Sequence, residues 1–255
     1  MLFNDIVFGP IHSRRLGTSL GINLLPSQHK LCNFNCVYCE CGFNTVAYNK
    51  KCTLPTIHDV VSSLEKFASA HHKDTLRTIN SITFSGNGEP TLHPDFAEIC
   101  RIIYVFRTGY MPQANITLLS NATTIGKLPT QNALKYIDNV ILKLDCGTPT
   151  QYKLINRAST QSFERLIENM TRFGRERIIQ TLLVKSTDPQ SGIDNTEQSE
   201  FSAYLKIVKA INPKSVMLYS IDRQTPDSTL IKIPTDKLEE YADQLRYLGI
   251  KTEVY

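Results

Sequence analysis

The chain has 255 residues, which is room for one large domain or two small ones, and 41% of them are hydrophobic, enough for a buried core. Charged residues make up 20%, which argues against a disordered chain, and the net charge of +4 is too small to indicate a nucleic-acid partner. No apolar run reaches the roughly 20 residues of a membrane helix and the N-terminus lacks a signal-peptide pattern, so we expect a cytoplasmic protein without a membrane anchor.

Strand and helix patterns alternate along the chain. Short apolar runs predict strands at 20–25, 81–85, 115–120, 140–145, 178–185 and 215–221, and the run 251–255 is a candidate terminal strand. Helical periodicity predicts helices at 59–72, 94–107, around Leu134, and at 162–174, 198–211 and 236–249. Ser162 and Gly174 are residue types that begin and end a helix. These patterns predict about six βα units in succession.

The predicted strands lack strict alternation of polar and apolar residues, which favours burial on both faces, as in a parallel sheet. A complete eight-unit barrel takes about 250 residues, and the unit count here is two short. The sequence therefore predicts an α/β fold, an incomplete (βα)6 TIM-type barrel. We expect one domain, 1–255, in which 1–55 carry the first strand and a cysteine loop and 56–255 carry the remaining βα units.

Four of the seven cysteines lie within ten residues, and three of these, Cys32, Cys36 and Cys39, have the spacing C-x3-C-x2-C. An odd count without a secretion signal disfavours a disulfide framework. Three cysteines on a four-iron cubane leave one iron open to another ligand. A zinc site with Cys41 or Cys52 as fourth ligand is the alternative, although Cys41 is too close to Cys39 to bind the same ion easily.

The cysteine triplet, with Tyr38 just before its last member, resembles the signature of the radical S-adenosylmethionine (radical SAM) superfamily. A second motif, SGNGEPTLHP, follows the predicted strand 81–85, and its residues 86–89 resemble the superfamily's Gly-Gly-Glu motif. The resemblance implies that the backbone of Gly86, Asn87 and Gly88 and the carboxylate of Glu89 receive the methionine ammonium of SAM. The alternative is an ordinary glycine-rich turn with a solvated glutamate.

Two further strand ends carry polar residues, and polar groups at the C-terminal ends of barrel strands are candidates for chemistry. Ser120 and Asn121 resemble the polar pair that contacts the ribose or carboxylate of SAM. Lys143 and Asp145 end the predicted strand 140–145, where they are candidate SAM contacts or inward residues paired with one another. Arg223 is a candidate contact for the substrate or the SAM carboxylate, or the salt-bridge partner of Asp222 or Asp227.

Three longer stretches, FGPIHSRRLGTSLGINLLP, FSGNGEPTLHPDF and IDRQTPDSTLIKIP, are similar to short radical SAM proteins related to the wybutosine-synthesis enzymes of tRNA. The resemblance implies that Cys32, Cys36 and Cys39 hold a [4Fe–4S] cluster. The resemblance also implies that, with one electron from an external donor of the flavodoxin or ferredoxin type, the cluster cleaves SAM to a 5′-deoxyadenosyl radical, which abstracts hydrogen from the substrate.

The resemblance and the basic residues Arg14 and Arg15 favour a tRNA or other RNA substrate. The absence of any cysteine before Cys32 separates this sequence from relatives that build a second cluster there, and it weakens transfer of their reaction. A peptide or a small molecule is the alternative substrate. A non-catalytic zinc or nucleic-acid-binding module is the alternative from a different class. For Cys41, Cys52 and Cys146 we expect unligated thiols rather than a second metal centre.

Overall fold

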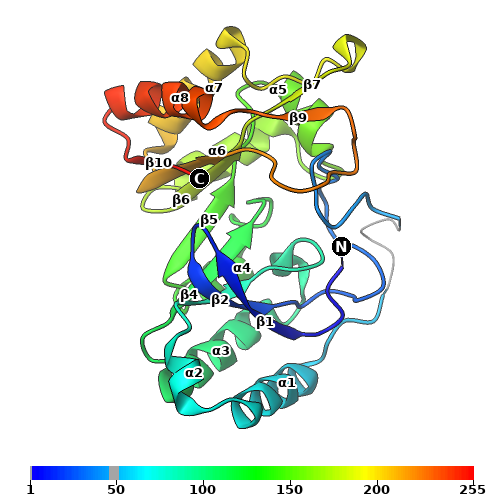
Figure 1. The fold of residues 1–255 in the computed structure, drawn as a ribbon, viewed down its shortest axis with the longest axis vertical. Helices are drawn as coiled ribbons and strands as arrows, with labels where there is room; N and C mark the ends of the chain where they lie inside the picture. Colours follow the sequence, from blue (N-terminus) through cyan, green and yellow to red (C-terminus); the bar gives the residue numbers. More distant parts are fainter. Residues whose placement is uncertain (1, 46–51) are drawn as a thin grey trace. The chain divides into compact units, whose positions relative to one another are not determined.

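The computed structural model describes residues 2–45 and 52–255, which divide by their contacts into two compact units (Figure 1). The first unit comprises Met1–Cys32, Asn44–Ser120 and Gly126–Val140. The second comprises Asn33–Phe43, Asn121–Ile125 and Ile141–Tyr255. The expected organisation as one domain divided after residue 55 stays a prediction. Within the described residues, no helix combines the length and the apolar character needed to cross a bilayer.

The sheet of the first unit contains β1 (Val7–Ser13), β2 (Gly17–Ile22), β3 (Ser81–Phe84) and β4 (Asn115–Ser120). β2, β3 and β4 pair in parallel, while β1 pairs antiparallel with β2. The sequence did not indicate β1, because its middle residues are exposed and it contains a proline, which is tolerated at a sheet edge. The cysteines therefore follow the first parallel strand but the second strand of the chain.

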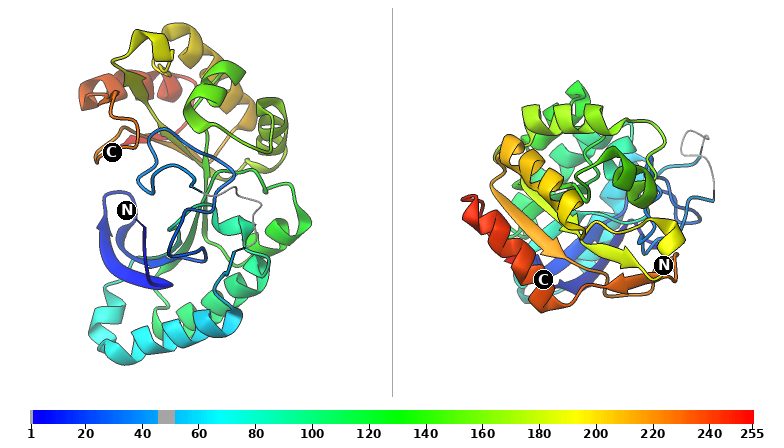
Figure 2. Two further views of the ribbon diagram at one scale, coloured as in Figure 1. Left: turned by 90° about the vertical axis from the view of Figure 1, so that its right-hand side faces the viewer. Right: turned by 90° about the horizontal axis from the view of Figure 1, so that it is seen from above.

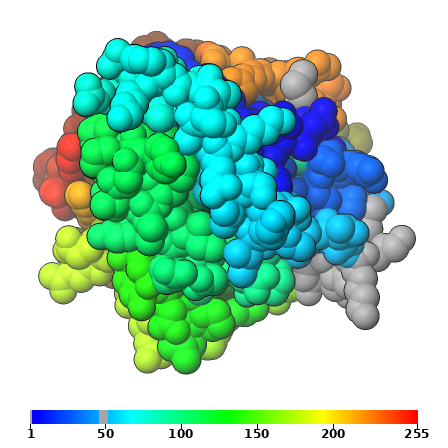
Figure 3. All heavy atoms as spheres, turned by 90° about the horizontal axis from the view of Figure 1, so that it is seen from below, coloured from blue at the N-terminus to red at the C-terminus, as the bar shows by residue number. Residues whose placement is uncertain are grey.

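Four α-helices belong to the first unit: α1 (Ile57–Ala70), α2 (Lys73–Arg77), α3 (Phe96–Tyr110) and α4 (Leu128–Leu134). A short 3-10 turn, η1 (Pro90–Leu92), follows the glycine-rich motif. Thr56 and Asp59 form a capping box at the start of α1, which satisfies backbone donors that the helix itself leaves unpaired. α1, α2 and α3 form much of the surface seen in Figure 3.

The second unit contains four parallel strands, β5 (Asn139–Lys143), β6 (Ile178–Leu182), β8 (Ser215–Tyr219) and β10 (Thr252–Val254), of which β5 begins in the first unit. The single strand predicted at 178–185 is two strands. β6 ends at Leu182, and β7 (Val184–Ser186) pairs instead with β9 (Leu230–Lys232), beside which it lies in Figure 2. The side chain of Asn195 marks this break, because it bonds both Leu182 O and Val184 N.

The helices of the second unit are α5 (Pro149–Gln151), α6 (Phe163–Phe173), α7 (Gln198–Ile211) and α8 (Thr235–Tyr247), with a 3-10 turn η3 (Pro189–Ser191). Ser162 caps α6 by accepting from Arg165 N at 3.3 Å, and Gly174 ends the helix, as predicted. A π-helical turn, η2 (Tyr152–Asn156), was not indicated by the sequence. Such turns often occur at functional sites.

Candidate functional site

The glycine-rich motif in the first unit is a turn that only glycine accommodates. Gly86 and Gly88 have φ values of +129° and +142°, and a Cβ on Gly88 would collide with the carbonyl oxygen of Leu31. Leu31 N donates to Asn87 O at 2.8 Å, and Glu89 N donates to Leu31 O at 3.1 Å. The turn is therefore attached to the residue directly before Cys32.

Glu89 and Ser120 were predicted as site residues from different strand ends, and the structure brings their side chains together. Glu89 is 2% exposed, and its Oε1 accepts hydrogen bonds from Ser120 Oγ at 2.8 Å, Thr91 Oγ1 at 2.6 Å and Thr91 N at 3.2 Å. These hydrogen bonds orient the carboxylate on the turn. A buried carboxylate of this kind can pair with an ammonium group.

The side chain of Asn87, in the same motif, forms hydrogen bonds with residues outside the turn. Its amide donates to Phe3 O and Pro26 O, both at 2.8 Å, and accepts from Phe3 N at 2.8 Å. Its backbone N–H donates to the side chain of Asn23. The Asn87 side chain therefore attaches the turn to the N-terminal segment, and the predicted contact of this residue with SAM stays a prediction.

The cysteine loop of the second unit is fixed to the π-helical turn by its backbone. Asn35 N donates to Asn156 O at 2.9 Å, and Val37 N donates to Ile155 O at 3.0 Å. Cys36 is buried in this loop, and Cys39 is half-buried. A tight turn follows Cys36, since Cys39 N donates to Cys36 O at 3.1 Å.

Cys32, the first residue of the triplet, is the last residue of the N-terminal segment of the first unit, and it is buried. Across the described ranges, no three His, Cys, Asp or Glu side chains surround a point where one metal ion could sit. A four-iron cubane does not require the three sulfurs to converge on one ion, because each of its cysteines binds a separate iron at a corner of the core.

Asn121 is tied to the residue that follows Cys32. Its Nδ2 donates to Asn33 Oδ1 at 2.7 Å, and Asn33 Nδ2 donates in turn to Thr123 Oγ1 at 2.8 Å. Thr123 Oγ1 donates back to Asn121 Oδ1 at 2.7 Å. The three side chains form a ring of hydrogen bonds, which joins residues 121–123 to the cysteine loop within the second unit. Asn33 was not identified from the sequence.

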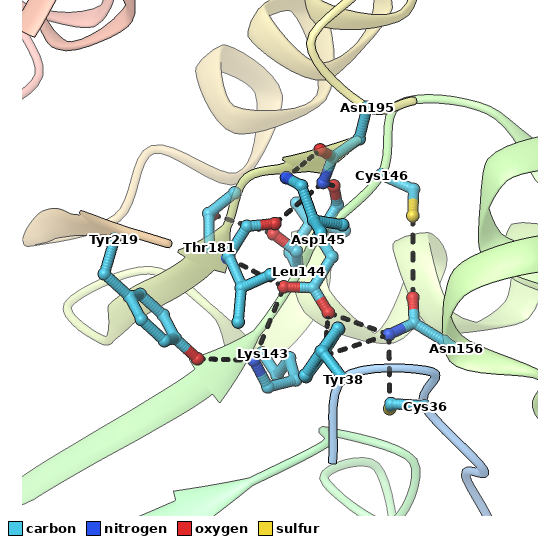
Figure 4. Close-up of polar contacts among 12 residues, drawn as sticks. Cys36, Tyr38, Lys143, Leu144, Asp145, Cys146, Asn156, Thr181, Asn195 and Tyr219 are labelled. Atoms are coloured by element: carbon cyan, nitrogen blue, oxygen red, sulfur yellow. Dashed lines mark hydrogen bonds and ion pairs between the residues drawn. The ribbon is translucent and has the colours of Figure 1, made fainter. Parts of the chain in front are cut away.

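Asp145 is the centre of a buried polar network in the second unit (Figure 4). Its side chain is fully buried and accepts from four donors: Tyr38 Oη, Asn156 Nδ2 at 2.7 Å, Leu182 N at 2.9 Å and Lys143 Nζ at 3.4 Å. Four donors fill the acceptor positions of a carboxylate. The pairing of Lys143 with Asp145, which the sequence offered as one alternative, is therefore present, and it fixes Tyr38 at the same time.

Lys143 stays positively charged in this network. Burial alone would lower its pKa, but the charge of Asp145 and the contact with Tyr219 outweigh burial and raise it. Lys143 Nζ donates to Tyr219 Oη at 2.8 Å and lies 4.9 Å from the ring centroid of Tyr38, within cation–π range. Burial, with the charge of Asp145, raises the pKa of Tyr38 well above its usual range, so Tyr38 is a neutral donor.

Tyr219 and Asn156 belong to this network and were not identified from the sequence. Tyr219 lies near the end of the predicted strand 215–221 and ends β8, so the strand-end reasoning that selected Lys143 could have found it. Asn156 has no such signal, because it lies in an irregular turn. Arg223 pairs with Glu40 of the cysteine loop at 2.6 Å, a partner that the sequence did not indicate.

Comparisons with known proteins show to which family the chain belongs. The model of the "Radical SAM superfamily" matches residues 29–190, more than half of the chain. A UPF0026 protein of Helicobacter pylori (strain ATCC 700392 / 26695) is 31% identical over 225 residues, which cover 86% of this chain and 67% of that protein. A GTPase Obg of Brachyspira hyodysenteriae is 28% identical over 92% of this chain, which spans only 32% of that longer protein.

The fold is also found among solved structures. The "Structure of TYW1 with a lysine-pyruvate adduct bound" superposes with a TM-score of 0.62 at 15% identity, covering 91% of this chain and 75% of that chain. With the mostly parallel strands of both units, this likeness confirms the predicted α/β class and incomplete TIM-type barrel. The chain belongs to the radical SAM superfamily, whose enzymes use a [4Fe–4S] cluster and SAM and take an electron from an external donor.

Proposed function

We propose that Cys32, Cys36 and Cys39 hold the [4Fe–4S] cluster and that Glu89 binds the methionine ammonium of SAM. The observation that carries this assignment is the buried carboxylate of Glu89. Thr91 and Ser120 hold it on a turn whose glycines permit close approach of a ligand. When bound, the cluster supplies the electron for reductive cleavage of SAM.

The surroundings of Cys36 suit a metal-bound sulfur. Burial, followed by the charges of Asp145 and Cys39, raises the pKa of its thiol, so without metal the thiol is protonated. A bound metal reverses this, because a coordinating thiol is deprotonated. Asn156 Nδ2 lies 3.5 Å from Cys36 Sγ, where it can donate to a thiolate. The residues present therefore fit the cluster.

Tyr38 and its partners complete the proposed SAM site. We assign Tyr38 to the adenosyl part of SAM, with Asp145 and Lys143 holding the tyrosine in place. Asn121 contributes through its hydrogen bond to Asn33 in the cysteine loop. In this assignment Asp145 and Lys143 act through Tyr38, because each already has its own buried partners.

Anaerobic reconstitution tests the assignment. The wild-type chain should take up about four irons and release 5′-deoxyadenosine from SAM when a reductant is added. Cys36→Ala should abolish this release. Glu89→Gln should keep the iron and weaken SAM binding. Stoichiometric zinc with indifference to SAM would instead support the non-catalytic module.

For the substrate we propose an RNA of the tRNA type. The fold neighbour TYW1 and the tip of the β1–β2 hairpin support this choice. Ser13 Oγ accepts from Arg15 N at 3.3 Å and Leu16 N at 3.2 Å, so the turn that carries Arg14 and Arg15 is ordered. Arginine side chains are well suited to phosphate groups.

RNA binding at increasing salt checks this choice. Removing one arginine–phosphate interaction lowers the slope of log affinity against log salt by about 0.7 to 0.9. Arg14→Ala with Arg15→Ala should weaken tRNA binding and lower this slope, whereas Arg165→Ala on α6 should change neither. If tRNA does not bind, or if peptides or metabolites alone stimulate 5′-deoxyadenosine release, the substrate belongs to another class.

A further inference from the structure

Asn156 ends the π-helical turn and contacts a cluster cysteine from outside the cysteine motif (Figure 4). The residue is 2% exposed. Its Nδ2 lies 3.5 Å from Cys36 Sγ, 2.7 Å from Asp145 Oδ2 and 3.4 Å from Tyr38 Oη. One amide nitrogen therefore faces the sulfur, the central carboxylate and the aromatic residue of the motif.

The orientation of this amide is determined from both ends. Cys146 Sγ donates to Asn156 Oδ1 over 3.6 Å, while the carboxylate of Asp145 accepts from Nδ2. Burial raises the pKa of Cys146 well above its usual range, with the charge of Asp145 adding to the effect, so this thiol keeps its proton and remains a donor. A flipped amide would present Oδ1 to the carboxylate, where two acceptors would face each other, so the hydrogen bond to Asp145 would be lost.

The backbone of the same turn holds the cysteine loop. Asn156 O and Ile155 O accept from Asn35 N and Val37 N, the residues on either side of Cys36. Arg157 follows in the left-handed conformation, with φ of +47°, and ends the turn. Side chain and backbone of Asn156 therefore act on the same cysteine, one on its sulfur and the other on its loop.

We propose that Asn156 is a positioning residue that donates a hydrogen bond to the cluster sulfur of Cys36 and raises the reduction potential of the cluster. This inference rests on the proposed cluster site. Reduction adds negative charge to the cluster and its sulfur ligands, and a donor to the sulfur stabilises the reduced form more than the oxidised form. Cys146 and Asp145 contribute by keeping the donor aimed at the sulfur.

The test measures the midpoint potential of the reconstituted holoenzyme without SAM, by a redox titration monitored with electron paramagnetic resonance. Asn156→Leu removes the donor at similar volume, and the potential should shift to more negative values. Asn195→Leu is the matched control. Asn195 is another buried amide, with bonds to Asp145 O at 2.9 Å and Leu182 O at 2.7 Å, and its replacement should lower stability but leave the potential unchanged.

An unchanged potential in a fully loaded Asn156→Leu enzyme overturns the inference. So does an equal negative shift in Asn195→Leu, because the shift would then follow from general loosening. If the leucine variant does not fold, Asn156→Ser decides with the same prediction, since serine is too short to reach the sulfur. A wild-type chain that forms no four-iron cluster refutes the proposed function instead, so the two failures are distinguishable.

Discussion

Replacing Asp145 by asparagine tests the buried network most severely. The change keeps the shape of the side chain but removes the only charge paired with Lys143 Nζ among the contacts drawn in Figure 4, and it turns one acceptor oxygen into a donor. Removing one partner of a buried ion pair costs roughly 3–5 kcal/mol, because the other charge stays buried without compensation. The side chain of Lys143 is 19% exposed, so water partly hydrates its charge. We therefore expect a decrease in the free energy of unfolding at the lower end of this range, about 3 kcal/mol.

Urea unfolding of the apo chain measures this decrease. The double variant Asp145→Asn with Lys143→Met should recover part of the stability, since no unpaired charge then remains. Glu98→Gln is the control, because Glu98 forms an exposed pair with Arg101 on α3 and such pairs contribute about 1 kcal/mol or less. A decrease below about 1 kcal/mol for Asp145→Asn, or strictly additive effects of the two changes, would refute the assignment of a coupled buried pair.

Three further predictions concern residues of the first unit. Glu89→Gln should weaken SAM binding roughly 10- to 100-fold with iron content unchanged, as expected when a charged hydrogen-bond partner is removed; equal affinity in a calorimetric titration would contradict this. Gly88→Ala should lower the melting temperature and the cluster content, because the added Cβ would meet the Leu31 carbonyl. Gly109→Ala is the control: this position of α3 is open, and the change should stabilise the chain by about 0.5–1 kcal/mol. Burial raises the pKa of Cys100 above its ordinary 9.0. The unfolded chain therefore loses this proton first, and the free energy of unfolding should decrease above about pH 9 by up to ~1.4 kcal/mol per pH unit. Cys100→Val should remove that part of the slope.

The regular elements were predictable because their sequence patterns are local. β4 and α7 have the predicted bounds, and α6 begins and ends at its predicted caps. β1 was missed because an exposed edge strand with a proline has no apolar pattern to detect. The run 178–185 was predicted as one strand because apolar content does not show where a chain leaves one sheet for another. That break depends on a tertiary contact, the side chain of Asn195.

Some residues of the candidate site could likewise be predicted from the sequence, and others could not. The cysteine triplet, Glu89 and Ser120 follow from motif spacing and from strand ends. Asn156 could not be predicted, because its role depends on a π-helical turn that brings residues 120 positions apart into contact. Strand-end reasoning also offers no means of choosing between a ligand contact and internal pairing for Lys143 and Asp145. The structure shows the internal pairing, since the carboxylate already has four donors.

The measurement that tests the central assignment most directly is the release of 5′-deoxyadenosine by the anaerobically reconstituted chain, with and without reductant. We expect a four-iron chain to form the nucleoside only with reductant and SAM together, and the variants Cys32→Ala, Cys36→Ala and Cys39→Ala to form none. A wild-type chain that carries a reduced four-iron cluster, binds SAM and still leaves it intact would contradict the assignment.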